Sequence, residues 1–306
     1  MSRDSASNPP GLPAGKPKLD VADGLLLLGV LFWGINFPIT KELLGVMGPA
    51  AYAVVRYGSA ALLLLVITLA QGGGVGLSRR DAGLLLLLGG LGVAGFQFFW
   101  AAGLDRTTSS NAGLLAGTSP IFGIFFAWVA RRRPTRWAVL GIFVAFLGAL
   151  LVVNNSLTHV AYAGGHWVGD LMCLAAQASW AFYTVLGAGL VERNGAFKVS
   201  SYAMLIGSAA LLPVAWPQLA AQDWGLFTPT LWGYLGFTTV FAGAGSFLFW
   251  YIAVGRIGVA RTLPYAYLVP VVAVTASVLM LGEQLTGIQL AGGALILGGI
   301  RITRIG

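Results

Sequence analysis

Long runs of apolar residues, separated by short polar segments, fill the chain from about residue 20 to residue 304. The runs do not alternate apolar and polar positions as strands do, and they approach the roughly 20 residues that a helix needs to cross a bilayer. Residues 1–20, rich in Ser, Pro and Gly, are predicted to form a disordered cytoplasmic tail. The pattern predicts an all-α integral membrane protein with ten transmembrane helices, at 22–43, 49–70, 81–104, 109–130, 136–154, 168–190, 199–216, 230–254, 260–281 and 286–303.

The two halves of the chain carry the same residues at equivalent positions, which we call repeat mates. Trp100, Arg106, Pro120 and Gly148 recur 150 positions later as Trp250, Arg256, Pro270 and Gly298, and Asp23 and Trp33 recur 147 positions later as Asp170 and Trp180. The sequence therefore predicts a first repeat at 21–155, an external linker at 156–167 and a second repeat at 168–306. Five crossings per half would make the second repeat enter from the opposite side, an inverted arrangement common in secondary transporters, whose substrate site lies at the midplane.

Two features of the repeats concern helix shape. Pro120 and Pro270 fall near the middle of predicted spans, and proline removes a backbone donor and bends a helix. We expect both bends to take part in gating. The last span is dense in Gly and Ala, which allow helix backbones to approach closely in lipid.

Composition excludes a water-soluble domain, because 57% of the 306 residues are hydrophobic and 9% are charged, against about 25% charged in an average soluble domain. The net charge of +8 does not indicate nucleic-acid binding, since most of the basic residues lie in loops. The positive-inside rule accounts for them and places both termini in the cytoplasm. Alternate loops hold most of the 18 Lys and Arg residues, including Arg79, Arg80, Arg131, Arg193 and Arg256, and the other side holds Lys41 and Arg106.

Known catalytic patterns are missing from the sequence. It contains no HExxH, GxSxG, P-loop or dinucleotide fingerprint, so we expect neither an enzyme nor a cofactor. His159 and His166 lack acidic or Cys neighbours and do not form a metal site, and the single Cys173 excludes an internal disulfide. The acidic residues Asp23, Glu42, Asp105, Asp170 and Glu283 fall at span ends, which weakens the case for direct proton coupling through a carboxylate at the midplane.

Polar and aromatic residues on single helix faces are candidates for a substrate path. Trp33 and Asn36 share one face of the first span, and Gln177 and Trp180 share one face of the sixth, so the two faces are predicted to oppose each other across the pseudo-axis. Amide groups would hold the polar end of a substrate and rings would flank its apolar part. Further candidates are Gln97, Trp100, Asn111, Thr118, Ser246, Trp250 and Tyr265. The alternative is an interfacial aromatic belt with hydrogen bonds between helices.

Arg56 is the sole basic residue well inside a predicted span. A buried guanidinium could meet a substrate carboxylate. The residue lies only seven positions after Pro49, however, so the favoured interpretation is structural, with Arg56 reaching outward or pairing with Glu42.

The segment PYAYLVPVVAVTASVLMLGEQLTGIQLAGGALILGG, with its mid-span proline, Gly-Glu turn and Gly-rich last helix, resembles the second EamA domain of the drug/metabolite transporter superfamily. The segment LFWGINFPITKELL, followed by Pro49 and Arg56, resembles the opening of the first EamA domain. One departure is ArgArgArgPro at 131–134, where the family often has its own Gly-Glu turn, so Glu283 has no counterpart there. The resemblance implies ten helices in two EamA repeats, alternating access and export of small metabolites.

Within the superfamily, the aromatic content is similar to that of YddG-like bacterial amino-acid exporters. We therefore expect a secondary transporter in the bacterial inner membrane that exports aromatic or other apolar amino acids. The alternatives are export of drugs, nucleosides or sugars, or a channel-like or structural membrane protein. The expected partners are the lipid bilayer and a small-molecule substrate, with no nucleic acid, and the oligomeric state stays open, a monomer included.

Overall fold

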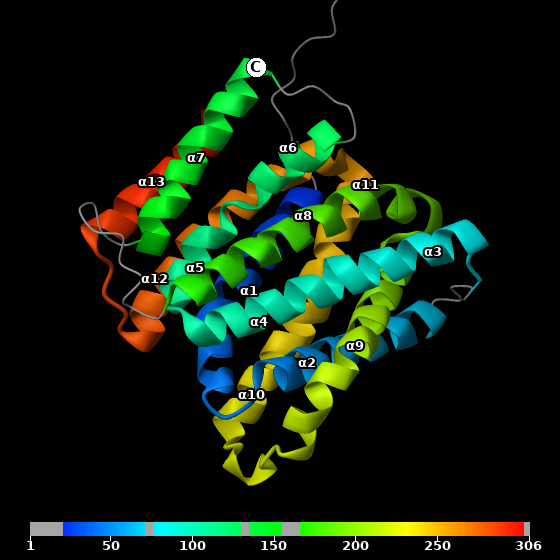
Figure 1. Cartoon of the computed structure of the whole chain (residues 1–306). Helices are drawn as coiled ribbons and strands as arrows, with labels where there is room; N and C mark the ends of the chain where they lie inside the picture. Colours follow the sequence, from blue (N-terminus) through cyan, green and yellow to red (C-terminus); the bar gives the residue numbers. More distant parts are fainter. Residues whose placement is uncertain (1–20, 71–75, 130–134, 155–165, 303–306) are drawn as a thin grey trace, which may run out of the picture.

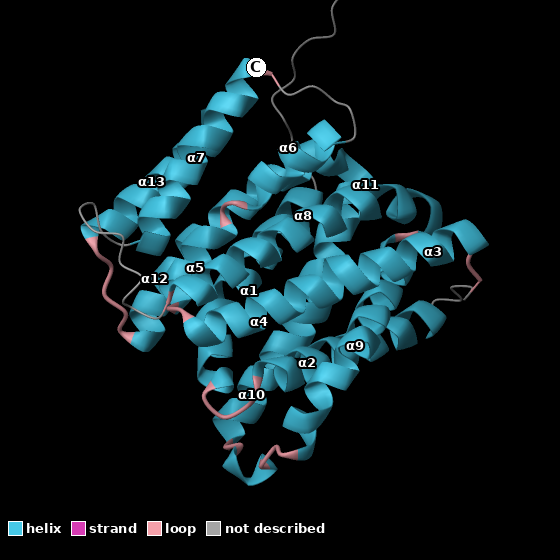
Figure 2. Cartoon of the chain, viewed as in Figure 1, coloured by secondary structure: helices cyan, strands magenta, loops and turns pink. Residues whose placement is uncertain are grey.

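The computed structural model describes residues 21–70, 76–129, 135–154 and 166–302, and within these ranges the fold is helical, with no strand (Figures 1 and 2). The predicted tail, most of the predicted linker and Arg131–Arg133 lie outside the described residues. The first half contains α1 (Val21–Leu44), α2 (Pro49–Ala70), α3 (Arg79–Leu87), η1 (Leu88–Ala94), α4 (Gly95–Arg106), α5 (Ser109–Ala116), α6 (Ser119–Val129) and α7 (Arg136–Asn154).

The second half begins one residue after His166 and repeats this order. It contains α8 (Trp167–Asn194), α9 (Ala196–Ala220), η3 (Trp224–Leu226), α10 (Pro229–Phe237), η4 (Thr238–Gly245), α11 (Ser246–Thr262), η5 (Leu263–Leu268), α12 (Val269–Leu281) and α13 (Gly287–Ile302). Each predicted apolar segment coincides with one or more of these helices.

Six helical stretches are long and apolar enough to cross a membrane by length and composition. They are Val21–Leu44, Pro49–Ala70, Arg79–Arg106, Trp167–Asn194, Ala196–Ala220 and Pro229–Gly258. Shorter apolar helices cover Val139–Val152, Val269–Leu281 and Gly287–Gly299. The chain is therefore a multi-pass helical membrane protein, and the exact number of crossings stays a prediction.

Both halves contain a π-helical segment inside their third long helix. The segment η1 lies between α3 and α4, and η4, which starts 150 positions later, lies between α10 and α11. The i→i+5 pattern of a π-helix is rare and is concentrated at functional sites. Its occurrence at matching positions is structural evidence for the repeat, independent of the shared residues.

Both halves also interrupt their fourth helix before a proline. In the first half α5 ends at Ala116 and α6 begins at Ser119, and in the second half the 3₁₀ segment η5 precedes α12. Pro120 and Pro270 each occupy the second position of the new helical segment. A missing N–H costs nothing in a first turn, so the prolines fix where each new segment starts.

Several contacts between a helix of the first repeat and a helix of the second have an equivalent with the two repeats swapped. α4 packs on α8, and the equivalent pair is α11 on α1. In the same way α6 on α8 corresponds to α12 on α1, and α9 on η1 corresponds to α2 on η4. Two further pairs, α7 with α13 and α2 with α9, lie at the sides, and Figure 1 shows the first of them along one edge of the molecule. This is the pattern expected when a pseudo-two-fold axis relates two repeats.

The first helices of the two repeats run in opposite directions. Lys41, near the end of α1, donates from Nζ to the carbonyl of Thr107 at 2.7 Å, and Thr107 Oγ1 donates to Asp170, near the start of α8, at 2.6 Å. The rings of Trp33, which precedes Lys41 in α1, and Trp180, which follows Asp170 in α8, lie 5.2 Å apart. An antiparallel pair of first helices is what an inverted repeat requires.

Glycine allows the last helices of the two repeats to touch along their backbones. A methyl group on Gly148 of α7 would lie 2.5 Å from the carbonyl oxygen of Gly292, and one on Gly299 would lie 2.5 Å from that of Gly141. The close approach expected for the last span is therefore confirmed. It does not use Gly298, the repeat mate of Gly148, which faces open space.

Candidate functional site: a central aromatic cavity

A cavity of about 60 Å³ lies between the two repeats. Most of its wall is apolar and aromatic, with a few polar groups. The lining residues are Trp33, Asn36, Phe37, Arg56, Tyr57, Phe96, Trp100, Ala116, Ser119, Gln177, Trp180, Phe247, Ala266 and Val269.

Three pairs of repeat mates line the cavity, which places it on the pseudo-axis. Trp33 and Trp180 come from α1 and α8, 147 positions apart. The other two pairs, each 150 positions apart, are Ala116 with Ala266 and Ser119 with Val269. These four small residues flank the interruptions between α5 and α6 and between η5 and α12, so both helix breaks open onto the cavity.

Four rings form the tightest part of the wall. The ring of Trp180 lies 5.2 Å from that of Trp33 and 5.0 Å from that of Phe247, both near perpendicular, and 5.4 Å from that of Phe96. Edge-to-face contacts of this kind hold rings in fixed orientations. Trp33 is fixed further, because its Nε1 donates to the carbonyl of Ala242 at 3.1 Å. The wall is therefore held in place before a ligand enters.

Two amides on this wall are unused. Asn36 is 2% exposed and its Oδ1 has no hydrogen-bond partner. Gln177 is 5% exposed, and no hydrogen bond within the described residues uses its amide. The hydroxyl of Tyr57 is also buried without a partner. Because an unpaired buried polar group is costly, these groups are available to the polar part of a ligand.

Arg56 also lines the cavity, and the interpretation that it reaches outward or pairs with Glu42 is wrong. The Arg56 side chain is 2% exposed, whereas Glu42 is exposed at the end of α1. Nε of Arg56 donates to the carbonyl of Thr238, the first residue of η4, at 2.8 Å. The distance from Pro49 fixes the depth of Arg56 but not the face of α2 from which it projects, and that face points inward.

Of the eleven predicted path residues, the structure brings five together on this cavity. They are Trp33, Asn36, Trp100, Gln177 and Trp180. The other six are Gln97, Asn111, Thr118, Ser246, Trp250 and Tyr265, which do not line it. Their place on a path stays a prediction.

These six residues have other surroundings. Thr118 donates to the carbonyl of Leu115, Ser246 to that of Phe241, and Tyr265 to Asp23 at 2.6 Å. Trp250 supports the wall from behind, with its ring 5.5 Å from those of Trp33 and Trp180. Gln97 is fully buried, with both amide atoms unpaired.

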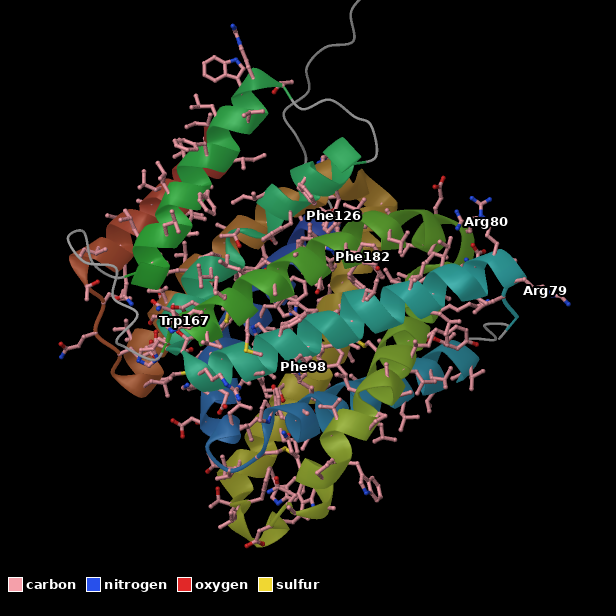
Figure 3. The ribbon with its side chains drawn as sticks, in the orientation of Figure 1. Arg79, Arg80, Phe98, Phe126, Trp167 and Phe182 are labelled. Carbon is pink, nitrogen blue, oxygen red and sulfur yellow. The ribbon has the colours of Figure 1, made fainter. Side chains whose placement is uncertain are left out.

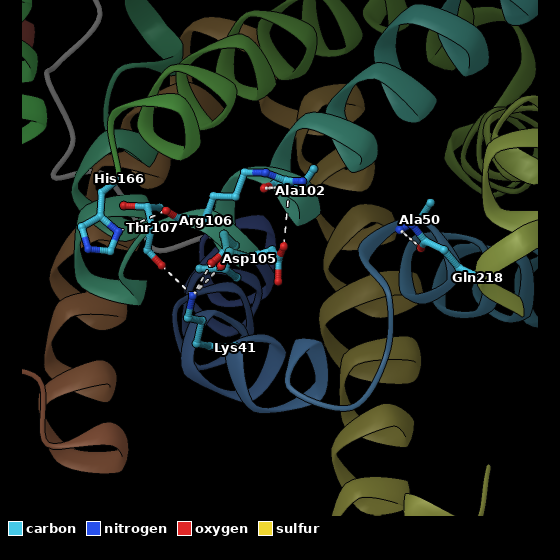
Figure 4. A network of polar contacts seen from close by, with 9 residues as sticks. Lys41, Ala50, Ala102, Asp105, Arg106, Thr107, His166 and Gln218 are labelled. Carbon is cyan, nitrogen blue, oxygen red and sulfur yellow. Dashed lines mark hydrogen bonds and ion pairs between the residues drawn. The ribbon is translucent and has the colours of Figure 1, made fainter. Parts of the chain in front are cut away.

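A polar network at the Lys41 end of the molecule could not be predicted from the sequence. The carboxylate of Asp170, fully buried, accepts hydrogen bonds from Thr107 at 2.6 Å and Asn111 at 3.3 Å, and Gln289 of α13 donates to Asn111 at 2.6 Å. Lys41 donates to the backbone carbonyls of Leu104, in the last turn of α4, and of Thr107, in the α4–α5 connection (Figure 4). The members come from five helices or their connections, so no spacing along the chain indicates that they meet.

Glu283 belongs to the same end. Its two carboxylate oxygens accept from the backbone N–H groups of Ser109 and Ser110, at 2.9 and 2.8 Å. These N–H groups have no partner inside α5, and a negative charge is favourable at a helix N-terminus. The Gly-Glu turn thus ties the second repeat to the fourth helix of the first.

The opposite end of the molecule is basic. Arg193 and Asp81 form an ion pair at 2.7 Å, and Lys198 donates to the carbonyl of Gly76 at 3.2 Å. Figure 3 shows Arg79 and Arg80 at this end of the long α3–α4 helix and Trp167, which begins α8, at the other. Positive charge is therefore distributed unevenly between the two ends.

Two repeats of apolar helices around a central aromatic cavity indicate a multi-pass membrane protein of the small-molecule transporter class. The EamA-like transporter family matches residues 21–154 and again 167–305, and the chain belongs to this family. The protein is therefore a membrane transporter and not an enzyme.

Related proteins carry transporter names. The chain is 28% identical to the uncharacterized transporter YyaM of Bacillus subtilis, covering 90% of this chain and 91% of that one. It is 30% identical to a probable terminal-alkyne amino-acid exporter of Streptantibioticus cattleyicolor, over 93% and 94% of the two chains. It is 29% identical to a probable amino-acid metabolite efflux pump of Salmonella typhimurium, over 93% and 95%. Such bacterial relatives indicate the inner membrane.

A solved crystal structure has the same fold. It superposes with a TM-score of 0.67 at 19% sequence identity, covering 93% of this chain and 96% of the other.

Proposed function

We propose that the protein exports an aromatic or other apolar amino acid across the inner membrane by alternating access. The observation that carries this proposal is the central cavity, where repeat mates build an aromatic wall around two unused amides. Rings accommodate an apolar side chain, and the amides of Asn36 and Gln177 offer donors and acceptors to an amino or carboxyl group. The names of two relatives, an amino-acid exporter and an amino-acid efflux pump, agree with this substrate class.

The proposed topology has ten crossings in two inverted repeats of five, with both termini in the cytoplasm. The antiparallel course of α1 and α8 supports the inversion. The basic end that carries Arg79, Arg80, Arg193 and Lys198 is then cytoplasmic by the positive-inside rule. The end that carries Lys41 and His166 is external, as predicted for the linker.

Alternating access is proposed to use the two helix breaks. Both open onto the cavity and both precede a proline, so each provides a place where a half-helix can change direction without losing hydrogen bonds. Rocking of one repeat against the other would expose the cavity to each side in turn. Asp23 and Asp170 are repeat mates. The contact between Asp23 and Tyr265 lies near the start of α1, and the Asp170 network lies near the end of α1. Each would close the cavity toward one side of the membrane.

Counterflow in proteoliposomes tests the proposed function, because it needs neither a known direction nor a known coupling ion. Vesicles are loaded with unlabelled phenylalanine, and entry of labelled phenylalanine is followed while external competitors are added. We expect phenylalanine, tryptophan and leucine to compete and lysine, uridine and glucose to have no effect, with protein-free vesicles as the control. Entry of labelled phenylalanine no faster than in the protein-free vesicles, or inhibition by uridine or glucose but by no amino acid, would contradict the proposal.

A further inference from the structure

We propose that Arg56 binds a carboxylate of the substrate, so that the cavity selects solutes that carry a carboxylate beside an apolar body. This inference deepens the proposed function and rests on it for the location of the substrate. It identifies the group that would separate amino acids from the neutral sugars and nucleosides and the cationic drugs that related transporters could carry.

The guanidinium of Arg56 is held in one orientation. Its Nε donates to the Thr238 carbonyl at 2.8 Å, and its central carbon lies 4.9 Å from the ring centre of Tyr57 and 5.3 Å from that of Trp100. These contacts fix the side chain but use only one of its three nitrogens. Within the described residues, no acceptor is hydrogen-bonded to the two terminal nitrogens, and the residue lines the cavity.

The charge of Arg56 has no counter-charge in the described part of the chain. Ion pairs there join Arg106 to Asp105 and Arg193 to Asp81, both away from the cavity. The cavity lining contains no Asp or Glu. An unpaired buried cation is costly in a membrane protein, and such a cation usually pairs with an anion or with several backbone carbonyls. An anionic group that enters the cavity would supply this partner.

A carboxylate is the anion that suits this geometry. The two terminal nitrogens of a guanidinium form a planar fork that matches the two oxygens of a carboxylate, so both can be bound at once. From Trp100, which lies beside Arg56, the wall continues to Phe96, with ring centres 6.4 Å apart, and from Phe96 to Trp180 at 5.4 Å. A substrate with its carboxylate at Arg56 would lay its apolar part along these rings.

The residue at the repeat-mate position of Arg56 supports the idea that Arg56 orients the substrate in the cavity. In the second half the equivalent position, 147 residues later, is Ala203, which is fully buried against η1. Packing between the second helix of a repeat and the π-helical segment therefore does not require arginine, since α9 achieves it with a small residue. Only the first repeat carries a charge at this position. The otherwise pseudo-symmetric cavity therefore has one positively charged end.

Ligand-induced thermal stabilisation of the detergent-purified protein tests this inference without requiring transport. Four ligands are titrated: phenylalanine, phenylalaninamide, 3-phenylpropanoate and phenethylamine. We expect the wild type to bind phenylalanine and 3-phenylpropanoate about 10- to 100-fold more tightly than the two ligands without a carboxylate, as a hydrogen-bonded charge pair would give. Arg56→Gln should abolish this preference without weakening the binding of phenethylamine, because the variant also removes a positive charge that repels this cation.

Arg56→Lys keeps the charge and should keep part of the preference, which separates the charge from the hydrogen bond to Thr238. A role in packing alone would weaken all four ligands equally in Arg56→Gln, and that outcome would overturn the inference. Equal binding of phenylalanine and phenylalaninamide by the wild type would also overturn it while leaving the amino-acid function standing. Binding of 3-phenylpropanoate but not of phenylalanine would contradict the amino-acid function and leave the role of Arg56 standing, and binding of none of the four would contradict both.

Discussion

Replacing Trp180 with alanine is expected to slow counterflow of phenylalanine about tenfold or more, because the variant loses the ring that closes one side of the cavity. The ring of Trp180 contacts those of Trp33, Phe96 and Phe247 at 5.0–5.4 Å. A ring contact between Trp180 and the substrate would contribute about 0.5–1.5 kcal/mol beyond area burial, and about 1.4 kcal/mol corresponds to a factor of ten in affinity. Alanine as substrate has no side chain that reaches this wall, so its counterflow should change less.

The test of Trp180→Ala is the ratio of its effects on counterflow of phenylalanine and of alanine. Two tryptophans away from the cavity provide controls: Trp216 on α9 is 65% exposed, and Trp224 in η3 is 41% exposed. Their alanine variants should transport phenylalanine normally. Equal losses for phenylalanine and alanine in Trp180→Ala, or a loss in Trp216→Ala of the same size, would show that the effect is not one of cavity shape.

Replacing Asp170 with alanine is expected to lower the Tm of the purified protein by about 5 °C or more. The carboxylate accepts from Thr107 and Asn111 in a site that is fully buried. Its removal leaves both donors unsatisfied, at about 1–3 kcal/mol each, and about 1 kcal/mol lowers the Tm of a protein of 150–250 residues by about 2–4 °C. Asp170→Asn keeps one carbonyl oxygen as an acceptor and should cost less.

A matched control for Asp170 is Asp223, which is exposed and accepts from the N–H of Gly225 in a surface turn. Asp223→Ala should leave the Tm nearly unchanged. An unchanged Tm in Asp170→Ala would mean that the network between α5, α8 and α13 does not hold this end of the molecule together.

The sequence predicted those parts of the cavity that depend on one helix at a time. Trp33 and Asn36 share a face of α1, and Gln177 and Trp180 share a face of α8, and both faces line the cavity as helical periodicity predicts. The shared offsets then indicated that these two helices are repeat mates. Periodicity and duplication together were sufficient for this pairing.

Other lining residues could not be predicted, because their role depends on which face of a helix meets which neighbour. Phe96 and Phe247 stand in apolar helices where a phenylalanine facing lipid and one facing a cavity give the same pattern. Arg56 required knowledge of where the Thr238 carbonyl lies, and η1 and η4 have no local sequence signal that separates them from ordinary helix. The Asp170 network required five helices to be placed at once.

Protection of a thiol in the cavity by substrate tests most directly the claim that the central cavity binds the transported amino acid. Ser119→Cys introduces a nearly isosteric thiol into the lining, Gln284→Cys introduces one in the exposed connection between α12 and α13, and native Cys173 is buried. We expect saturating phenylalanine to slow alkylation at position 119 several-fold and to leave alkylation at position 284 unchanged. An unchanged rate at position 119, in a variant that still transports phenylalanine, would contradict the account.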